Sequence, residues 1–182
     1  MVVLTFASTN QNKYREVESI LSTHGIPVDF AQENLIEIQS DSIEDIVKEK
    51  AKNAYALLGK PVIVEDDGLF IDLLKGFPGQ YSSYAFKTIG NEGILKLLDG
   101  SINRSASFRS LIAFCDDARL SVSEGKVDGR IYDKITEGGW GYDPIFVPAG
   151  TSLTFAQLEE KKNEHSHRKS ALDNFAKWYL KL

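Results

Sequence analysis

The sequence predicts an α/β protein in which a mixed, twisted β-sheet with flanking helices bends around a central groove. In the first half of the chain, short apolar runs alternate with segments whose apolar residues recur at helical spacing. In the middle, residues 106–115 and 120–131 are two β-rich runs separated by a polar turn, which is typical of a long hairpin. No shift in composition divides the 182 residues, so we expect a single domain over 1–182.

The first third of the chain is predicted to form a strand, two helices and a second strand. Residues 2–7 are a continuous apolar run, as in a buried strand, and residues 8–10 (Ser-Thr-Asn) supply capping groups for a following helix. A second helix is expected over 43–58. Its inward residues are predicted to be Ile46, Val47, Ala54, Leu57 and Leu58. Residues 62–64 then form a short strand that ends at the carboxylates of residues 65–67.

The rest of the chain adds loops and shorter elements to the hairpin. Residues 76–81 are rich in Gly and Pro and predict a loop, which a short helix over 91–98 follows. Residues 138–144 hold three glycines and two aromatic residues, so we expect a loop that contacts something flat. Residues 145–147 return to a strand, and an amphipathic helix is predicted over 166–180.

Composition excludes several classes of protein. A formal net charge of -5 and a pI of about 5.3 argue against a protein that wraps nucleic acid or lies on an anionic membrane. The single cysteine, Cys115, cannot form an intrachain disulfide, and its apolar neighbours indicate core packing in a strand. The first residues show neither a basic region nor a long apolar run, so we expect no signal peptide, no membrane span and a cytoplasmic location.

One dense cluster of polar residues lies at 162–168 (KNEHSHR), just before the last predicted helix. Arg offers a planar fork to phosphate or keto oxygens, Lys a mobile point charge, and Ser and His neutral hydrogen bonds. The pattern therefore indicates an anion-binding site. A solvated helix start with a Ser cap is the plainer alternative.

Three further patterns point to the same ligand. Asn10 and Lys13 lie at a helix N-terminus, where an anion is favoured. Residues 65–67 place three carboxylates at the end of a strand, an arrangement that calls for a cation unless it is a solvated turn. Trp140 and Tyr142, flanked by glycines, could stack on a base or simply pack. Together the patterns indicate a pocket for a metal-bound nucleotide.

Over nearly its whole length the chain resembles the inosine triphosphate pyrophosphatases, also called non-canonical purine NTP or dITP/XTP pyrophosphatases, and in particular an archaeal-like member. The resemblance rests on motifs in a fixed order. These are Ser8-Thr9-Asn10 with Lys13, residues 34–39 (NLIEIQ), Lys50, residues 64–69 (VEDDGL) with 76–79 (GFPG), residues 139–146 (GWGYDPIF), and Lys162-Asn163 with Ser166-His167-Arg168.

The resemblance implies two lobes around a nucleotide-binding cleft and a Mg²⁺-dependent hydrolysis of ITP, dITP and XTP to the monophosphate and pyrophosphate, with water attacking the α-phosphorus. Mn²⁺ is a possible substitute for Mg²⁺, and a homodimer is implied. By position, Asp66 matches the general base and a metal ligand, and Glu37 the other metal ligand. The positions matched to substrate binding are Ser8, Thr9, Asn10, Lys13, Lys50, Asp67, Trp140, Gly141, Tyr142, Asp143, Lys162, Ser166, His167 and Arg168.

Within this resemblance, Trp140 should stack on the base. A donor from His167 or Arg168 would favour the 6-oxo group of hypoxanthine and xanthine over the amino group of adenine. The chain departs from the common pattern at Asp67, where relatives often carry Ser or Thr, and at Ser83, where some carry Lys.

Two other functions fit part of the evidence. A Maf-like pyrophosphatase would make the same cut on a modified pyrimidine triphosphate, but the Ser166-His167-Arg168 block is foreign to that class. A nucleotide-binding sensor would hold the ligand without turnover.

Overall fold

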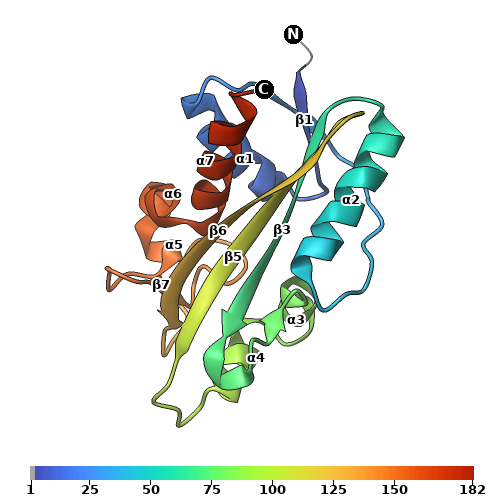
Figure 1. Cartoon of the computed structure of the whole chain (residues 1–182). Coiled ribbons are helices and arrows are strands. Elements are labelled where there is room, and N and C mark those ends of the chain that lie inside the picture. Colours follow the sequence, from blue (N-terminus) through green and yellow to red (C-terminus); the bar gives the residue numbers. More distant parts are fainter. Residues whose placement is uncertain (1–2) are drawn as a thin grey trace. The chain divides into compact units, whose positions relative to one another are not determined.

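The computed structural model describes residues 3–182 and contains a mixed β-sheet of seven strands with helices packed against it (Figure 1). The strand order is β2-β1-β3-β5-β6-β7, and β4 pairs with β3. β1 runs parallel to β2 and β3, whereas β4 is antiparallel to β3 and β7 is antiparallel to β6. The predicted α/β class with a mixed sheet is confirmed.

The strands are β1 (Leu4–Ala7), β2 (Val28–Ala31), β3 (Val62–Ile71), β4 (Pro78–Gly79), β5 (Ser105–Cys115), β6 (Leu120–Ile131) and β7 (Phe146–Pro148). The helices are α1 (Gln11–Thr23), α2 (Ile43–Leu58), α3 (Ser82–Thr88), α4 (Gly90–Leu97), α5 (Phe155–Leu158), α6 (Lys162–His165) and α7 (His167–Tyr179), with 3₁₀ turns η1 (Asp72–Leu74) and η2 (Glu159–Lys161). None of the helices described over residues 3–182 is long and apolar enough to cross a bilayer.

The chain folds into two compact units, each built from separate segments. Unit 1 contains the residues up to Asp66, Ser110–Gly125 and Arg168–Leu182. Unit 2 contains Asp67–Arg109 and Lys126–His167. Strands β3, β5 and β6 therefore each contribute residues to both units. The expectation of a single domain stays a prediction.

Unit 1 has a helical layer on each face of its strands. Successive residues of a strand point to opposite faces, so Phe6 and Ala7 of β1 enter different cores. Phe6 packs with α1 and α7, through side chains such as Leu21 and Phe175. Ala7 packs with α2, through side chains such as Val47. Figure 1 shows α1 and α7 on one side of these strands and α2 on the other.

The two long helices of unit 1 begin at polar caps. The Asn10 side chain accepts hydrogen bonds from the backbone N–H groups of Asn12 and Lys13 at 2.9 and 3.3 Å, and so begins α1. The Ser42 hydroxyl accepts from the backbone N–H of Asp45, and Gly59, with φ at 63°, ends α2. These caps fix where the functional side chains of α1 and α2 lie along each helix.

Unit 2 packs one apolar core between its strands and its short helices. Leu69 of β3 and Phe108 of β5 lie in this core with Phe146 and Phe155. At Gly68 the chain passes so close to β4 that an added Cβ would lie 2.4 Å from the carbonyl oxygen of Gly79. Only glycine fits at that position of β3.

Several predictions about the elements were wrong or incomplete. The strand predicted over 62–64 continues through the three carboxylates to Ile71, because their side chains find partners on both faces of β3. Leu57 was expected to face inward but is 61% exposed. The predicted final helix and long hairpin strands are confirmed within two residues. The short elements β2, α3, α5 and α6 were missed, and Val2 of the predicted first strand lies outside the described residues.

Candidate active site

The predicted site residues fall into two groups, one in each unit. Unit 1 holds Ser8, Thr9, Asn10, Lys13, Glu37, Lys50, Asp66 and Arg168. Unit 2 holds Asp67, Trp140, Gly141, Tyr142, Asp143, Lys162, Ser166 and His167.

The charged group of unit 1 is organised around Glu65, whose side chain is fully buried in β3. Its two carboxylate oxygens accept hydrogen bonds from Nε of Arg168 at 2.7 and 2.9 Å, and one also accepts from the Ser110 hydroxyl at 2.6 Å. Nη1 of Arg168 contacts the carboxylate of Glu16. A buried charge is stable only when it is paired and hydrogen-bonded, and this network satisfies that condition.

Arg168 was matched by resemblance to the edge of a bound base. In this structure its guanidinium has no exposed surface and pairs with Glu65 and Glu16. Its contact with a base stays a prediction, and its observed role is to neutralise the two carboxylates.

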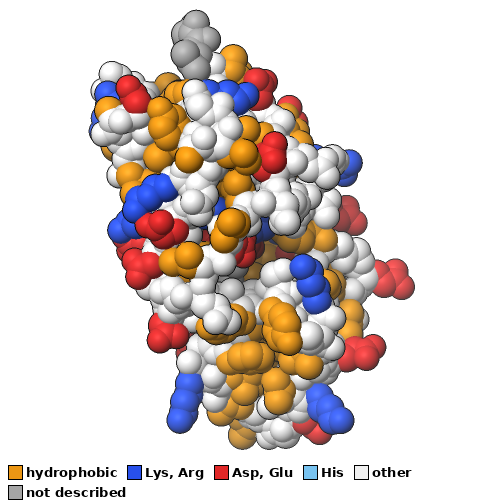
Figure 2. Space-filling view, turned by 90° about the vertical axis from the view of Figure 1, so that its right-hand side faces the viewer, with side chains coloured by type: hydrophobic (Ala, Val, Ile, Leu, Met, Phe, Trp, Pro, Cys, Tyr) orange, Lys and Arg blue, Asp and Glu red, His pale blue; other side chains and the backbone are white. Residues whose placement is uncertain are grey.

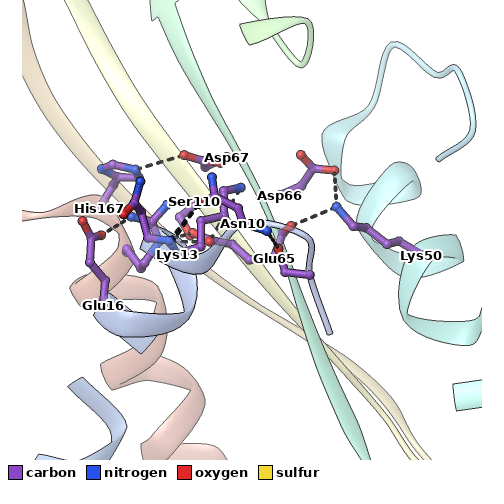
Figure 3. A network of polar contacts seen from close by, with 12 residues as sticks. Asn10, Lys13, Glu16, Lys50, Glu65, Asp66, Asp67, Ser110 and His167 are labelled. Atoms are coloured by element: carbon purple, nitrogen blue, oxygen red, sulfur yellow. Dashed lines mark hydrogen bonds and ion pairs between the residues drawn. The ribbon is translucent and has the colours of Figure 1, made fainter. Parts of the chain in front are cut away.

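The start of α1 supplies a second cation to the same network. Nζ of Lys13 lies 3.7 Å from a carboxylate oxygen of Glu65, and its side chain is 15% exposed (Figure 3). The Ser8 hydroxyl accepts from the backbone N–H of Asn10 at 3.1 Å, while Thr9 is exposed. Ser8 and Asn10 thus shape the turn that presents Lys13, and the N-terminus of α1 adds a favourable field for an anion.

Lys50 brings the two predicted metal ligands together. Its Nζ lies 2.5 Å from a carboxylate oxygen of Glu37 and 3.8 Å from one of Asp66. It also donates to the backbone carbonyl of Glu65 at 3.2 Å. Glu37 comes from the loop before α2, Lys50 from the buried face of α2, and Asp66 from β3, so three separate segments converge here. Figure 3 shows Lys50 reaching from α2 to Asp66.

The carboxylates of Glu37 and Asp66 fit a magnesium ion, because both are hard oxygen donors directed at one positive charge. Their side chains are 54% and 17% exposed, which leaves them accessible. Over residues 3–182 no group of three or more His, Cys, Asp or Glu side chains is arranged to hold a metal. Two protein carboxylates suit Mg²⁺, which usually keeps several waters and takes other ligands from substrate phosphates.

In unit 2 the glycine-rich loop places Trp140 beside a buried ion pair. The carboxylate of Asp143 accepts from Nζ of Lys162 at 2.8 Å and from the backbone N–H of Trp140 at 3.2 Å. Nζ of Lys162 lies 4.9 Å from the centroid of the Trp140 ring. The indole is half-buried, so the loop holds it in a defined orientation with a cation against it.

Tyr142 anchors this loop to the unit 2 core. The Tyr142 hydroxyl donates to the backbone carbonyl of Ser82 at 3.0 Å, and its ring makes an edge contact with Phe86. Burial raises the pKa of Tyr142 well above the usual range, so the hydroxyl keeps the proton that it donates. Asn91 donates to the carbonyl of Gly141 at 3.0 Å. Tyr142 was predicted to bind substrate, and its observed contacts are those of a residue that positions the loop.

His167 and Ser166 are almost fully buried in unit 2. The imidazole of His167 stacks on Phe108, with ring centroids 4.5 Å apart and planes 10° from parallel. Nε2 of His167 lies 3.7 Å from a carboxylate oxygen of Asp67. The unusual acidic residue at position 67 is thus an electrostatic neighbour of His167.

Sequence reasoning missed the residues that support the site, above all Glu16, Ser110 and Asn91. Ser110 carried a detectable signal, because it is a polar residue within the apolar run of β5. Glu16 and Asn91 lie on helices among other polar residues, where nothing in the pattern distinguishes them.

Known proteins resemble this chain over almost its whole length. The model of the Ham1 family matches residues 4–178. The dITP/XTP pyrophosphatase of Methanopyrus kandleri is 50% identical over 177 residues, which cover 96% of this chain and 94% of that protein. The dITP/XTP pyrophosphatase of Hyperthermus butylicus is 45% identical over 178 residues, covering 97% and 94%.

Solved structures show the same fold. A HAM1 protein from Coxiella burnetii superposes with a TM-score of 0.87 at 29% identity, covering 100% of both chains. The Staphylococcus aureus Ham1 protein superposes with a TM-score of 0.81, also at 29% identity, covering 97% of this chain and 98% of that one. With a family match over almost the whole sequence and relatives identical at up to half of the aligned positions, this chain belongs to the Ham1 family.

Proposed function

We propose that the protein hydrolyses dITP, XTP and ITP to the nucleoside monophosphate and pyrophosphate, and so removes deaminated purine nucleotides before polymerases use them. The observation that carries the proposal is the convergence of Asp66, Glu37 and Lys50, a carboxylate pair and a cation, in a chain whose relatives are named dITP/XTP pyrophosphatases. Hydrolysis of a triphosphate needs charge neutralisation, an oriented water and a grip on the leaving group.

The residues of unit 1 supply these functions. Asp66 accepts a proton from the water that attacks the α-phosphorus, and its half-buried carboxylate would orient that water. Lys13 and Lys50 hold the charge of the departing pyrophosphate. Glu37 and Asp66 would hold Mg²⁺, with Mn²⁺ as a substitute, and the metal when bound would neutralise the phosphate oxygens.

The residues of unit 2 supply base recognition. A purine would stack on Trp140, whose ring orientation is fixed by Asp143 and Lys162. The imidazole of His167 is a donor candidate for a 6-oxo group, which hypoxanthine and xanthine carry and adenine lacks. A site that offers a donor leaves an adenine amino group unpaired, and that penalty favours the deaminated bases.

The decisive experiment is a product-resolved assay. Purified protein with Mg²⁺ is given ITP, XTP, dITP, GTP, ATP or a pyrimidine triphosphate in turn, and monophosphate and pyrophosphate are quantified by chromatography. We expect ITP, XTP and dITP to be cleaved to both products, with ATP and GTP nearly untouched. Cleavage of pyrimidine analogues alone would favour a Maf-like activity, and binding without pyrophosphate would favour a sensor.

An Asp66→Asn variant tests the assignment of the base. It should lose turnover by a factor of at least about 100, the lower end of general-base contributions, while retaining its fold by circular dichroism. Full residual activity in a folded Asp66→Asn protein would exclude Asp66 as the base.

We also propose that the protein is a homodimer that forms through unit 2. Apolar side chains that are 38–71% exposed occur on both sides of β4, on α3 and directly after α3, and Figure 2 shows hydrophobic side chains gathered over this part of unit 2. We call these residues the α3 patch: Phe77, Tyr81, Tyr84, Phe86 and Ile89. Contiguous apolar patches of this kind commonly mark interaction sites. The molar mass in solution should be about twice 20.3 kDa.

A cytoplasmic location completes the proposal, because one unpaired buried thiol, Cys115, suits a reducing compartment in which nucleotides are also consumed. Cell fractionation tests it, and recovery in an extracytoplasmic fraction would contradict it.

A further inference from the structure

The ammonium group of Lys50 sits where a positive charge is required. The Lys50 side chain is only 11% exposed, and its Nζ lies 2.5 Å from Glu37, 3.8 Å from Asp66 and 3.2 Å from the carbonyl oxygen of Glu65. Two carboxylates and a carbonyl dipole therefore point at one nitrogen. Taking an ammonium ion out of water is costly unless such partners surround it.

The carboxylates of Glu37 and Asp66 in turn require a cation close to them. Glu37 and Asp66 both approach Nζ of Lys50, and two carboxylates gathered at one point repel each other unless a cation lies between them. The ammonium group of Lys50 thus neutralises the two carboxylates without a metal ion. A metal ion that binds between Glu37 and Asp66 must displace the ammonium group or tolerate its charge at close range.

Free Mg²⁺ and a magnesium-bound triphosphate differ in how they meet this requirement. The bare ion brings positive charge for the carboxylates but offers Lys50 no new partner, so the buried ammonium would face a dication. The nucleotide complex brings the metal together with anionic phosphate oxygens, which can accept hydrogen bonds from Lys50. Only the complex lets both the carboxylates and the lysine exchange partners without leaving a charge unpaired.

We propose that Lys50 is a built-in counter-ion that occupies the Glu37–Asp66 carboxylate pair in the ligand-free protein and makes metal binding depend on the nucleotide. The inference rests on the proposed function and adds the order of binding, in which the metal and the triphosphate enter the site together. In this role Lys50 excludes free divalent ions from a site that it later completes by contacting phosphate.

The experiment measures metal binding without nucleotide. The wild-type protein and a Lys50→Met variant are titrated with Mn²⁺ alone, and free Mn²⁺ is read from its electron paramagnetic resonance signal. Lys50→Met should bind one Mn²⁺ at least about tenfold more tightly than the wild type, because one unit of positive charge next to the carboxylates is gone. Lys50→Arg keeps the charge and should bind Mn²⁺ as weakly as the wild type.

Two further variants separate the proposal from general charge effects. Lys52→Met makes the same change in net charge, but Lys52 pairs with Glu49 on the exposed face of α2, so its Mn²⁺ affinity should stay at the wild-type level. Adding Glu37→Gln to Lys50→Met removes one proposed ligand and should abolish the gain. Circular dichroism verifies the fold of each protein, and Lys50→Gln replaces Lys50→Met if the latter does not fold.

The proposal is wrong if removing the charge of Lys50 does not tighten Mn²⁺ binding, including the case in which no protein binds Mn²⁺ measurably. It is also wrong if Lys52→Met gains as much as Lys50→Met. Release of pyrophosphate from ITP by the wild type is scored separately. A protein that cleaves ITP without the predicted difference in Mn²⁺ affinity rejects this inference alone, whereas absence of cleavage rejects the proposed function.

Discussion

Replacing Glu65 with Gln should destabilise the protein strongly, because it breaks a buried ion pair from one side. The Glu65 carboxylate has no exposed surface and contacts Nε of Arg168 at 2.7 and 2.9 Å. Arg168 would keep Glu16 and one oxygen at position 65 but lose the negative charge and the second acceptor oxygen, because the new amide NH₂ is a donor that would face the guanidinium donor. Removing one partner of a buried pair costs about 3–5 kcal/mol. Since Gln can still accept from Ser110, we expect a loss of about 3 kcal/mol.

Thermal and urea denaturation followed by circular dichroism measure this loss. For a chain of this size, about 3 kcal/mol corresponds to a melting temperature lowered by roughly 6–12 °C. The matched control is Glu49→Gln, in which a 42% exposed carboxylate loses its pair with Lys52, and its free energy of unfolding should change by less than about 1 kcal/mol.

A second variant shows whether the cost comes from an uncompensated charge. Arg168→Met together with Glu16→Gln in the Glu65→Gln background removes the guanidinium and its remaining partner, and should recover part of the lost stability. If Glu65→Gln alone costs less than about 1 kcal/mol, or if the triple variant is less stable than Glu65→Gln alone, the reasoning from buried charge pairing is refuted.

Two other variants test the unit 2 assignments. Trp140→Ala should raise the KM for ITP by roughly 5- to 150-fold with a smaller effect on kcat, because a stacking contribution of about 1–3 kcal/mol is lost, and an unchanged KM would place the base elsewhere. Tyr84→Asp puts a charge in the α3 patch at a side chain that is 71% exposed, so the molar mass should fall toward 20.3 kDa with the fold intact. Leu57→Asp, an exposed position on α2, should leave the mass unchanged, and a Tyr84→Asp protein with wild-type mass would exclude this patch as the interface.

The elements that could be predicted carry their signals locally. The helix expected over 43–58 is α2 to the residue, because an apolar stripe lies between a Ser cap and a terminal glycine. The element α3 was missed because its seven residues include two exposed aromatic side chains, so no inward stripe is visible. The end of β3 was misplaced because carboxylates are poor strand formers, and only their distant partners explain why the strand continues through them.

The candidate site was predictable as a set of motifs but not as a set of contacts. Residue types and their spacing indicated a pocket for a metal-bound nucleotide, and the resemblance assigned Asp66, Glu37 and Lys50 to that pocket. The role of Glu65 was hidden, since its partner Arg168 lies 103 residues further along the chain. An aromatic side chain in a glycine-rich loop looks the same in sequence whether it binds or packs, so the packing contacts of Tyr142 could not be predicted, and its contact with substrate stays a prediction.

The composition of unit 1 has a consequence for how the protein is made. Strands β1 and β2 and helices α1 and α2 come from the residues up to Asp66, yet α7 and the guanidinium that neutralises Glu65 and Glu16 come from Arg168–Leu182. A nascent chain that has left the ribosome only as far as the hairpin therefore exposes the apolar face that α7 later covers, and carries two acidic side chains without their cation. Domains generally fold as units during synthesis. The residues up to Asp66 can therefore complete the core of unit 1 only after residues 168–182 have emerged.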